Sequence, residues 1–335
     1  MAFNLHPNRH RAAERSSTPP YHERVQLPPH IRRAIEERAG AIGFPALKRA
    51  AAALSDAYRD GKPARLTNDE AIAAYLVTRM PATYAAAHAV LGELRDLPVR
   101  SVLDIGAGTG AASLAARAFF PTADPVTLVE RDPSLASTAL SFLPGATAVH
   151  TDLNCAPAFP PHDLVIAAWS VGELSAPIAA RLWEAARVAL VVIEPGTPRG
   201  FALIRRLRDE LLAAGANMAA PCPAAMPCPM VEPDWCHFAA RVERSSLHRR
   251  IKDGALGYED EKYSYVALVR DPAALGHARV LRRPQHHPGW IELRLCTPTG
   301  IADRRVTRRD RAAFREARSA GWGTRLAQPK DGAGA

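Results

Sequence analysis

The sequence has few cysteines, and it lacks both a secretion signal and an uninterrupted apolar run. Five Cys among 335 residues are too few for a disulfide scaffold, so we expect a reducing compartment in which clustered thiols favour metal binding. The N-terminal MAFNLHPNRH has no apolar signal core, so we expect no secretion. The longest uncharged stretch, 211–231, contains four Pro and cannot form a continuous spanning helix, so we expect no membrane partner.

Wholesale disorder and collagen-like structure are also excluded by the composition. The sequence is 47% hydrophobic and 23% charged, close to the averages of globular proteins. At roughly 150 residues per domain, the length predicts two or three structural units.

Positive charge is concentrated near the C-terminus. The formal net charge is +9, and residues 279–330 contain 13 Lys and Arg against 4 Asp and Glu, a surplus of 9. Residues 1–30 are rich in Pro, Arg and His without apolar periodicity, which predicts a flexible basic arm. A nearly neutral body with a basic module at 271–335 favours a polyanionic partner such as nucleic acid, although a solvated basic surface would give the same composition.

Between residues 31 and 97 the apolar residues follow helical spacing. Ile31, Ile35 and Ile42 begin a series that continues to Met80, which predicts three or four amphipathic helices. Thr67 and Glu70 precede an apolar run with the spacing of a capping box. We therefore predict an N-terminal helical region at 31–97.

From residue 98 to 270 short β-rich runs alternate with helical segments, which predicts an α/β fold. Near-continuous apolar strands such as LVIAA and ALVVI are typical of a parallel sheet that helices cover on both faces. This regularity is lost at about 216–258, in a Pro- and Cys-rich insertion, and strand character returns at YSYVALVR. Beyond residue 270 we expect strands near 279–283, 290–295 and 301–306 and a basic helix at 308–318, which together form a small β-rich module.

The clearest motif is VLDIGAGTG at 102–110, in which a strand enters a Gly-rich turn before a helix. Glycine allows positive φ and close approach of the backbone to a ligand, and the helix N-terminus offers free N–H groups. Acidic residues stand at the ends of the first three strands. The candidate cofactor residues are Asp104, Gly106, Gly108, Gly110, Glu130 and Asp152.

This combination resembles the S-adenosylmethionine (SAM) site of class I methyltransferases. The resemblance implies that the loop holds the methionine part, that Glu130 binds the ribose hydroxyls and that Asp152 contacts the adenine amine. A dinucleotide of the NAD type and a sheet without a ligand are the alternatives. After the fourth strand the chain reads AAWSVGE, which contains neither an Asn-Pro-Pro-aromatic motif nor a Pro-Cys nucleophile, so the catalytic residues remain unknown.

Four cysteines form a candidate metal site. Cys222, Cys228 and Cys236 lie close together in the sequence, and Cys296 follows on a predicted strand. Four thiolates suit a structural zinc or an iron–sulfur cluster, and the spacing alone does not choose between them. His237 is an alternative ligand but is better explained as a packing neighbour, while Cys155 lies outside the set. Five unrelated free thiols are the simplest alternative.

Taken in order, several motifs resemble methyltransferase-like proteins of the small ribosomal subunit, a family with mitochondrial assembly factors and bacterial homologues. These motifs are VLDIGAGTG, the PCP loop, DWCHF at 234–238, YEDEKYSY at 258–265 and Cys296-Thr297. The resemblance implies a [4Fe–4S] cluster on Cys222, Cys228, Cys236 and Cys296, with zinc as the alternative. It also implies rRNA and proteins of the small subunit as partners, and a location on ribosomes of the cytoplasm or, in a eukaryote, the mitochondrial matrix.

Two functions follow from these features. The first is a SAM-dependent methyltransferase that acts on small-subunit rRNA or on a ribosomal protein during assembly. The second is a non-catalytic RNA-binding assembly factor that holds SAM and the iron–sulfur cluster without methyl transfer. The intact glycine loop supports SAM binding in both cases, and the missing acceptor motif favours the second.

Overall fold

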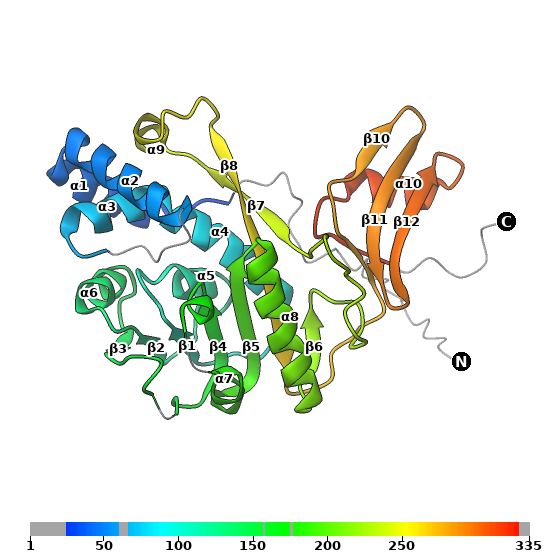
Figure 1. Cartoon of the computed structure of the whole chain (residues 1–335), viewed down its shortest axis with the longest axis horizontal. Coiled ribbons are helices and arrows are strands. Elements are labelled where there is room, and N and C mark those ends of the chain that lie inside the picture. The colour runs from blue at the N-terminus through cyan, green and yellow to red at the C-terminus, as the bar shows by residue number, and fades with distance from the viewer. Residues whose placement is uncertain (1–24, 60–65, 157, 175–176, 328–335) are drawn as a thin grey trace, which may run out of the picture.

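A computed structural model describes residues 25–59, 66–156, 158–174 and 177–327. The predicted arm at 1–30 therefore lies largely outside the described residues. The chain forms an eight-stranded sheet with flanking helices, a group of N-terminal helices and a smaller five-stranded sheet (Figure 1). Within the described ranges, no helix is long and apolar enough to cross a membrane.

The N-terminal region is helical, as its periodicity predicts. Its elements are α1 (Pro29–Ile42), α2 (Phe44–Arg59), α3 (Asp69–Thr78), α4 (Met80–Leu91) and the 3-10 turn η1 (Gly92–Leu94). The N-cap of α3 is Asn68, whose side chain accepts a hydrogen bond from the Ala71 amide at 2.8 Å. The predicted capping box at Thr67 is therefore wrong, because the neighbouring Asn68 caps the helix.

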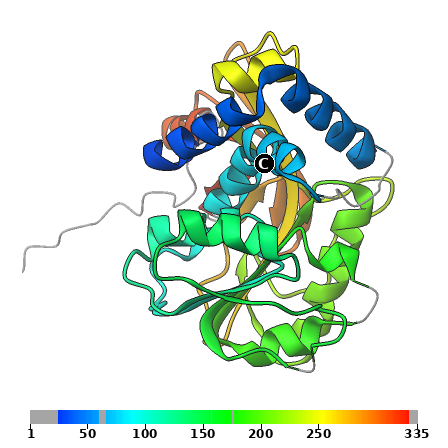
Figure 2. The same ribbon diagram turned by 90° about the vertical axis from the view of Figure 1, so that its left-hand side faces the viewer.

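These helices are continuous with the core of the large sheet. Ile31, Leu76 and Val90 belong to the same buried cluster as Val102, Val191 and Tyr265. Figures 1 and 2 show α1, α2 and α3 lying above the sheet and its flanking helices, at one side of the molecule. The helical region therefore shares its hydrophobic core with the α/β part.

The large sheet has the strand order β3-β2-β1-β4-β5-β8-β6, and β7 pairs with β8. Strands β1 to β5 pair in parallel, whereas β8 is antiparallel to β5, β6 and β7. The order 3-2-1-4-5 reverses direction between β1 and β4, which is the doubly wound arrangement of a Rossmann-like fold. Its strands are β1 (Val102–Ile105), β2 (Val126–Val129), β3 (Thr147–Val149), β4 (His162–Ala168), β5 (Ala186–Pro195), β6 (Asn217–Ala220), β7 (Phe238–Glu243) and β8 (Tyr258–Val269).

Helices cover both faces of this sheet, and β1, nearly all of β4 and residues 189–194 of β5 are buried. The helices and turns are α5 (Ala111–Phe119), α6 (Pro133–Phe142), η2 (Val171–Glu173), α7 (Ala179–Ala185), α8 (Pro198–Ala213) and α9 (Ser246–Ile251). The mixed α/β fold, its parallel sheet and its covering helices are thus confirmed. The region 216–258, predicted as an irregular insertion, contributes β6 and β7 to the large sheet itself.

The C-terminal residues form a separate five-stranded sheet with its own buried cluster. Its strands are β9 (Ala278–Val280), β10 (Gln285–His287), β11 (Trp290–Thr297), β12 (Gly300–Thr307) and β13 (Arg325–Leu326). One helix, α10 (Arg311–Ser319), contributes Phe314 and Ala317 to this cluster beside Ile291 and Leu293. In Figure 1 this sheet stands to the right of the main body.

Candidate functional site

The Gly-rich loop connects β1 to α5 at the carboxyl edge of the parallel strands. Gly106, Gly108 and Gly110 all have positive φ, at 70°, 53° and 80°. A Cβ at Gly106 would lie 2.4 Å from Ser170 Cβ, and one at Gly110 would lie 2.9 Å from Leu143 Cδ1. A Cβ at Gly108 would meet nothing within 4 Å. Gly106 and Gly110 are therefore needed for packing, and Gly108 is the position that leaves space for a ligand.

Asp104 lies beneath the loop. Its side chain is buried and accepts hydrogen bonds from the Ser113 amide at 3.1 Å and the Ser113 hydroxyl at 2.7 Å. Burial raises the pKa of Asp104 to about 6, and the Ser113 hydrogen bonds oppose this rise. The carboxylate thereby ties the first turns of α5 to β1 and sets the shape of the loop.

Glu130 and Asp152 follow the next two strands of the same edge. Glu130 accepts hydrogen bonds from the Gly108 amide and the Asp132 amide, each at 2.9 Å, so it lies directly against the loop. Asp152 is exposed and accepts from the amide and side chain of Asn154, and these hydrogen bonds lower the pKa of Asp152. The structure thus places the predicted acids at the ends of adjacent strands, at the edge of the sheet where doubly wound folds bind ligands.

The turn after β4 is held by an acid to which the sequence assigned no role. Glu194, at the end of β5, is 3% exposed and accepts a hydrogen bond from the Gly172 amide at 3.0 Å. Burial raises the pKa of Glu194 to about 7. Trp169, which begins the turn, has φ of 55° and packs against the main core. The sequence signal for this role is an acidic residue at the end of an apolar strand. A carboxylate buried there must accept hydrogen bonds from buried donors.

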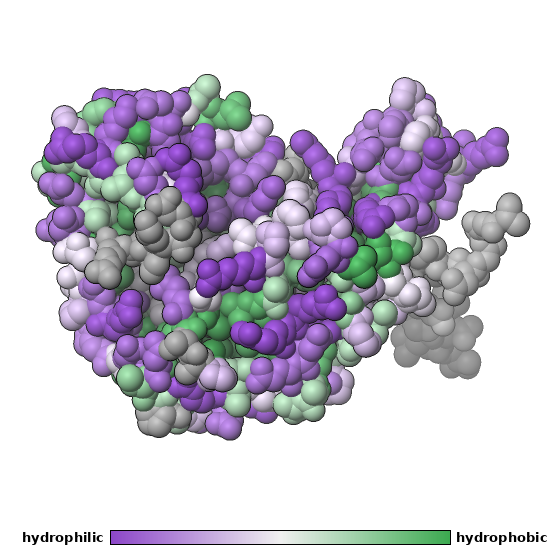
Figure 3. All heavy atoms as spheres, in the orientation of Figure 1, coloured by the Kyte–Doolittle hydropathy of each residue, from purple (hydrophilic) through white to green (hydrophobic). Residues whose placement is uncertain are grey.

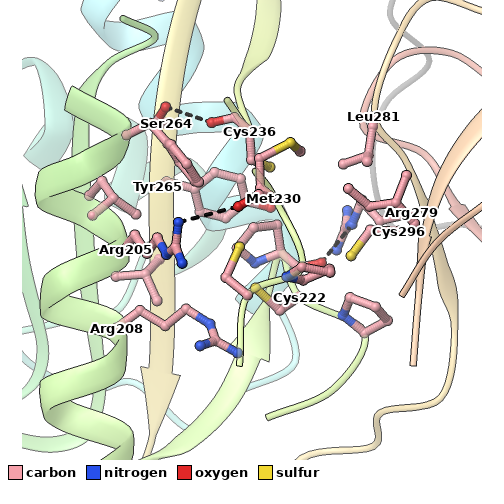
Figure 4. A pocket seen from close by; sticks show the side chains of 18 of the residues that line it. Arg205, Arg208, Cys222, Met230, Cys236, Ser264, Tyr265, Arg279, Leu281 and Cys296 are labelled. Atoms are coloured by element: carbon pink, nitrogen blue, oxygen red, sulfur yellow. Dashed lines mark hydrogen bonds between the residues drawn. The ribbon is translucent and has the colours of Figure 1, made fainter. Parts of the chain in front are cut away.

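The four predicted cysteine ligands line one pocket beside α8 (Figure 4). Cys222 and Cys228 lie in the loop after β6, Cys236 precedes β7, and Cys296 lies on β11 of the small sheet. All four thiols are free. Among the described residues, no three His, Cys, Asp or Glu side chains are arranged as a metal-binding group. The fold therefore brings the thiols to one place without the geometry of a coordinated metal.

Buried cations accompany these thiols. Arg208 on α8 is 4% exposed and Arg279 on β9 is 1% exposed, and both line the pocket. Burial raises the pKa of the Cys222 thiol, whereas Arg208 lowers it through charge and a hydrogen bond. Each arginine also has a carboxylate partner, Asp209 for Arg208 and Glu93 for Arg279.

His237, the alternative ligand, and Cys155, the fifth cysteine, do not line the pocket. The His237 ring stacks on Trp235 with centroids 5.0 Å apart and meets the edge of Trp322 at 4.9 Å. His237 therefore packs between aromatic side chains, as the sequence favoured. Cys155 is exposed in the loop after β3.

A buried ion pair joins the N-terminal helices to the small sheet. Glu93 in η1 accepts from Arg279 at 2.8 Å and lies 2.7 Å from Arg325 Nε. Arg279 also donates to the backbone carbonyls of Pro221, next to Cys222, and of Gly323. Arg279 thus connects the cysteine loop, η1 and the small sheet at one point. No local pattern in the sequence indicates this contact, because the three segments are far apart along the chain.

Comparisons with known proteins agree with these motifs. Residues 69–327 match the family described as mitochondrial small ribosomal subunit Rsm22. The Rsm22-cox11 tandem protein 2, mitochondrial, of Schizosaccharomyces pombe is 27% identical over 344 residues, covering 81% of this chain and 45% of that protein. The human ribosome assembly protein METTL17, mitochondrial, is 25% identical over 289 residues, covering 75% and 61%. The chain thus spans about half the length of the curated relatives it matches.

Solved structures of SAM-dependent methyltransferases are also similar. One from Aquifex aeolicus is 16% identical with a TM-score of 0.37, covering 58% of this chain and 95% of that one. A TehB-like enzyme from Corynebacterium glutamicum is 17% identical, also with a TM-score of 0.37, covering 55% and 88%. Since these scores are low, the fold assignment rests on the strand order described above. The match over 69–327 shows that the chain belongs to the Rsm22 family of the mitochondrial small ribosomal subunit.

Proposed function

We propose that the chain is a SAM-dependent methyltransferase-like protein that acts on the small ribosomal subunit during its assembly. The observation that carries this proposal is the open space at Gly108, beside the carboxylate of Glu130. Membership of the Rsm22 family, and the printed role of human METTL17 in ribosome assembly, support the ribosomal part.

In this proposal the loop binds SAM, which supplies a methyl group already activated on its sulfonium. Gly108 admits the ligand, Glu130 accepts hydrogen bonds from the ribose, and Asp152 lies near the adenine. Asp104 acts indirectly, because its carboxylate is engaged by Ser113 and holds the loop in place. Positioning of the acceptor would supply much of the rate.

The test of SAM binding is calorimetry on the wild type and on Gly108→Arg. The new side chain would fill the open space, so we expect loss of measurable SAM binding with the fold retained. Gly145→Arg is the matched control, because Gly145 also has positive φ and open surroundings but precedes β3 at the opposite edge. Unchanged SAM affinity in Gly108→Arg would refute the site.

Methyl transfer is tested separately with labelled SAM and immature small subunits. Transfer that depends on Gly108 would establish the enzyme, with rRNA and ribosomal proteins as candidate acceptors. SAM binding without transfer would favour the second function, a non-catalytic assembly factor. The Glu194 carboxylate accepts a hydrogen bond from the turn after β4 and so stabilises the fold. Because this acid then has a structural role and not a catalytic one, its position favours the second function.

We also propose that Cys222, Cys228, Cys236 and Cys296 hold one metal centre. The donor set fits, because all four thiols line one pocket, and four thiolates suit either an iron–sulfur cluster or a structural zinc. The resemblance to the ribosomal family favours [4Fe–4S] over zinc. Such a centre would close a loop of about 75 residues and so restrict the unfolded chain.

The experiment is anaerobic purification followed by iron, sulfide and zinc analysis of each Cys→Ser variant. We expect each of the four substitutions to remove the metal and Cys155→Ser to leave it in place. Colourless protein with stoichiometric zinc would overturn the iron–sulfur choice and keep the ligands. Full metal content in Cys296→Ser would show that Cys296 is not a ligand. It would thereby refute the proposed link between the cysteine loop and the small sheet through the metal.

A further inference from the structure

The small C-terminal sheet has one face packed on α10. Its other face carries Cys296, which lines the cysteine pocket, at one end of β11, and is directed outward at the Trp290 end. Along β11, Ile291, Leu293 and Leu295 are buried in the module's own core. The alternate positions Trp290, Glu292 and Arg294 point to the other face, where they are half-buried or exposed. Figure 3 shows the module, at the upper right, as a mainly hydrophilic surface set off from the body.

Three planar groups are stacked in a row on this outward face. The His287 ring of β10 lies parallel to the Trp290 indole, with centroids 3.7 Å apart and an interplanar angle of 10°. The Arg305 guanidinium of β12 lies over the same indole, 3.9 Å from its centroid. The strand registers fix this order, because β10 and β12 flank β11 on opposite sides. The row is therefore built into the sheet.

The row is open at its Arg305 end. One face of the guanidinium is covered by the indole, and the side chain remains 62% exposed, so its other face is available. Glu292 is the nearby acid, 4.0 Å from Arg305 and 3.8 Å from His287. This carboxylate therefore lies close to both outer members of the row.

Cations extend from the open end. Arg308 and Arg309 follow β12, and both are exposed, but the Arg308 guanidinium is directed toward α10, where it lies 5.9 Å from the centroid of the Phe314 ring. Residues 279–330 carry the surplus of 9 positive charges that equals the excess of the whole chain. A planar cationic surface beside exposed arginines complements a ligand that carries both flat bases and phosphates.

We propose that the outward face of β10, β11 and β12 binds an unpaired segment of RNA, with one base stacked on the Arg305 guanidinium. Trp290 and His287 support that guanidinium from behind, and Arg309 contacts an adjacent phosphate. A base inside a duplex cannot reach the stack, so the surface selects single-stranded RNA. This proposal rests on the proposed ribosomal function and names the surface that function would use.

The test is fluorescence anisotropy of the full chain with a labelled ten-nucleotide oligoadenylate, measured over a range of salt concentrations. The decisive variant is Arg305→Lys, which keeps the charge and removes the plane. We expect about tenfold weaker binding with an unchanged salt slope, since stacking is lost and the charge is kept. The matched control is Arg309→Lys, for which we expect wild-type affinity because phosphate contacts tolerate lysine.

Two further measurements separate the explanations. Trp290→Leu, checked for folding by circular dichroism, should weaken RNA binding as Arg305→Lys does, and the same sequence in a duplex should bind more weakly to the wild type. Heparin, a polyanion without bases, should bind wild type and Arg305→Lys equally. Wild-type affinity of Arg305→Lys for RNA, or an equal loss for RNA and heparin, would overturn the stacking surface alone. Failure of the wild type to bind any RNA would overturn the RNA partner as well.

Discussion

The glycine-loop site and the cysteine pocket are built over very different distances along the chain. The loop, Asp104, Glu130 and Asp152 lie within 49 residues, at the ends of three adjacent parallel strands. The pocket collects Cys222 and Cys228 from a loop, Cys236 from the residues before β7 and Cys296 from the second sheet. The first site therefore depends on local strand-turn-helix units, and the second depends on how distant elements dock.

The substitution with the largest expected effect on stability is Glu93→Gln, at the buried ion pair that joins η1 to the small sheet. It would leave Arg279 without its buried carboxylate partner. Removing one member of a buried pair costs about 3 to 5 kcal/mol, and the Glu93 side chain is 1% exposed. We expect that loss in the free energy of unfolding by urea, together with loosening of the cysteine pocket. Asp253→Asn breaks the exposed pair with Lys48 and should cost under about 1 kcal/mol. Equal losses of unfolding free energy in the two variants would show that the buried pair of Glu93 and Arg279 stabilises the fold no more than an exposed pair does.

A second substitution tests the local construction of the glycine loop. Gly110→Ala adds a methyl group 2.9 Å from Leu143 at a residue with φ of 80°, so strain and overpacking together should cost about 2 to 4 kcal/mol. Gly145→Ala has similar φ and open surroundings and should cost about 1 to 2 kcal/mol from strain alone. Thermal unfolding of both variants measures the difference, and similar melting temperatures would contradict a packing role for Gly110.

These two sites also show what the sequence could predict. The order of β1, loop, α5 and β2 was readable because each element signals itself within a few residues. β7 and the first half of β8 were not, because the polar YEDEK segment resembles a loop. The structure pairs it with β7 through ion pairs such as Arg241 with Asp260 at 2.8 Å. Convergence of Cys296 on the other thiols depends on where β11 docks, and no local pattern encodes that.

The third prediction concerns pH and the turn after β4. Because burial raises the Glu194 pKa from 4.5 to about 7, folding favours its protonated form. This contribution is fully present below pH 4.5 and is lost as the pH rises through about 7, with a total of about 3 kcal/mol. Glu194→Gln should therefore reduce the fall in unfolding free energy between pH 4.5 and 7. Exposed Glu184→Gln is the control, and an identical pH profile for wild type and Glu194→Gln would exclude this role.

The last prediction concerns the basic module, where the expected change is in RNA binding and its salt dependence and not in the stability of the fold. Reversing the charges of Arg304, Arg305, Arg308 and Arg309 should weaken binding and flatten the slope of log K against log salt by about 3, at ~0.7 per phosphate contact. SAM affinity should remain unchanged, because the glycine loop lies in the other sheet. A variant with wild-type affinity and slope would show that the surplus charge only solvates the surface.

The position of β8 has a consequence for how the polypeptide folds as it is synthesised. β8 lies between β5 and β6 in the sheet, although it follows both in the sequence. After β6 has left the ribosome, about 50 more residues must emerge before Val269 completes the strand between them. Until then the edge of β5 has no neighbour and β6 has no sheet to join. Such exposed edges attract other strands, and long-range pairing is slow. The nascent chain therefore passes through a stage in which protection by a chaperone, or early docking of the N-terminal helices, would decide whether it folds or aggregates.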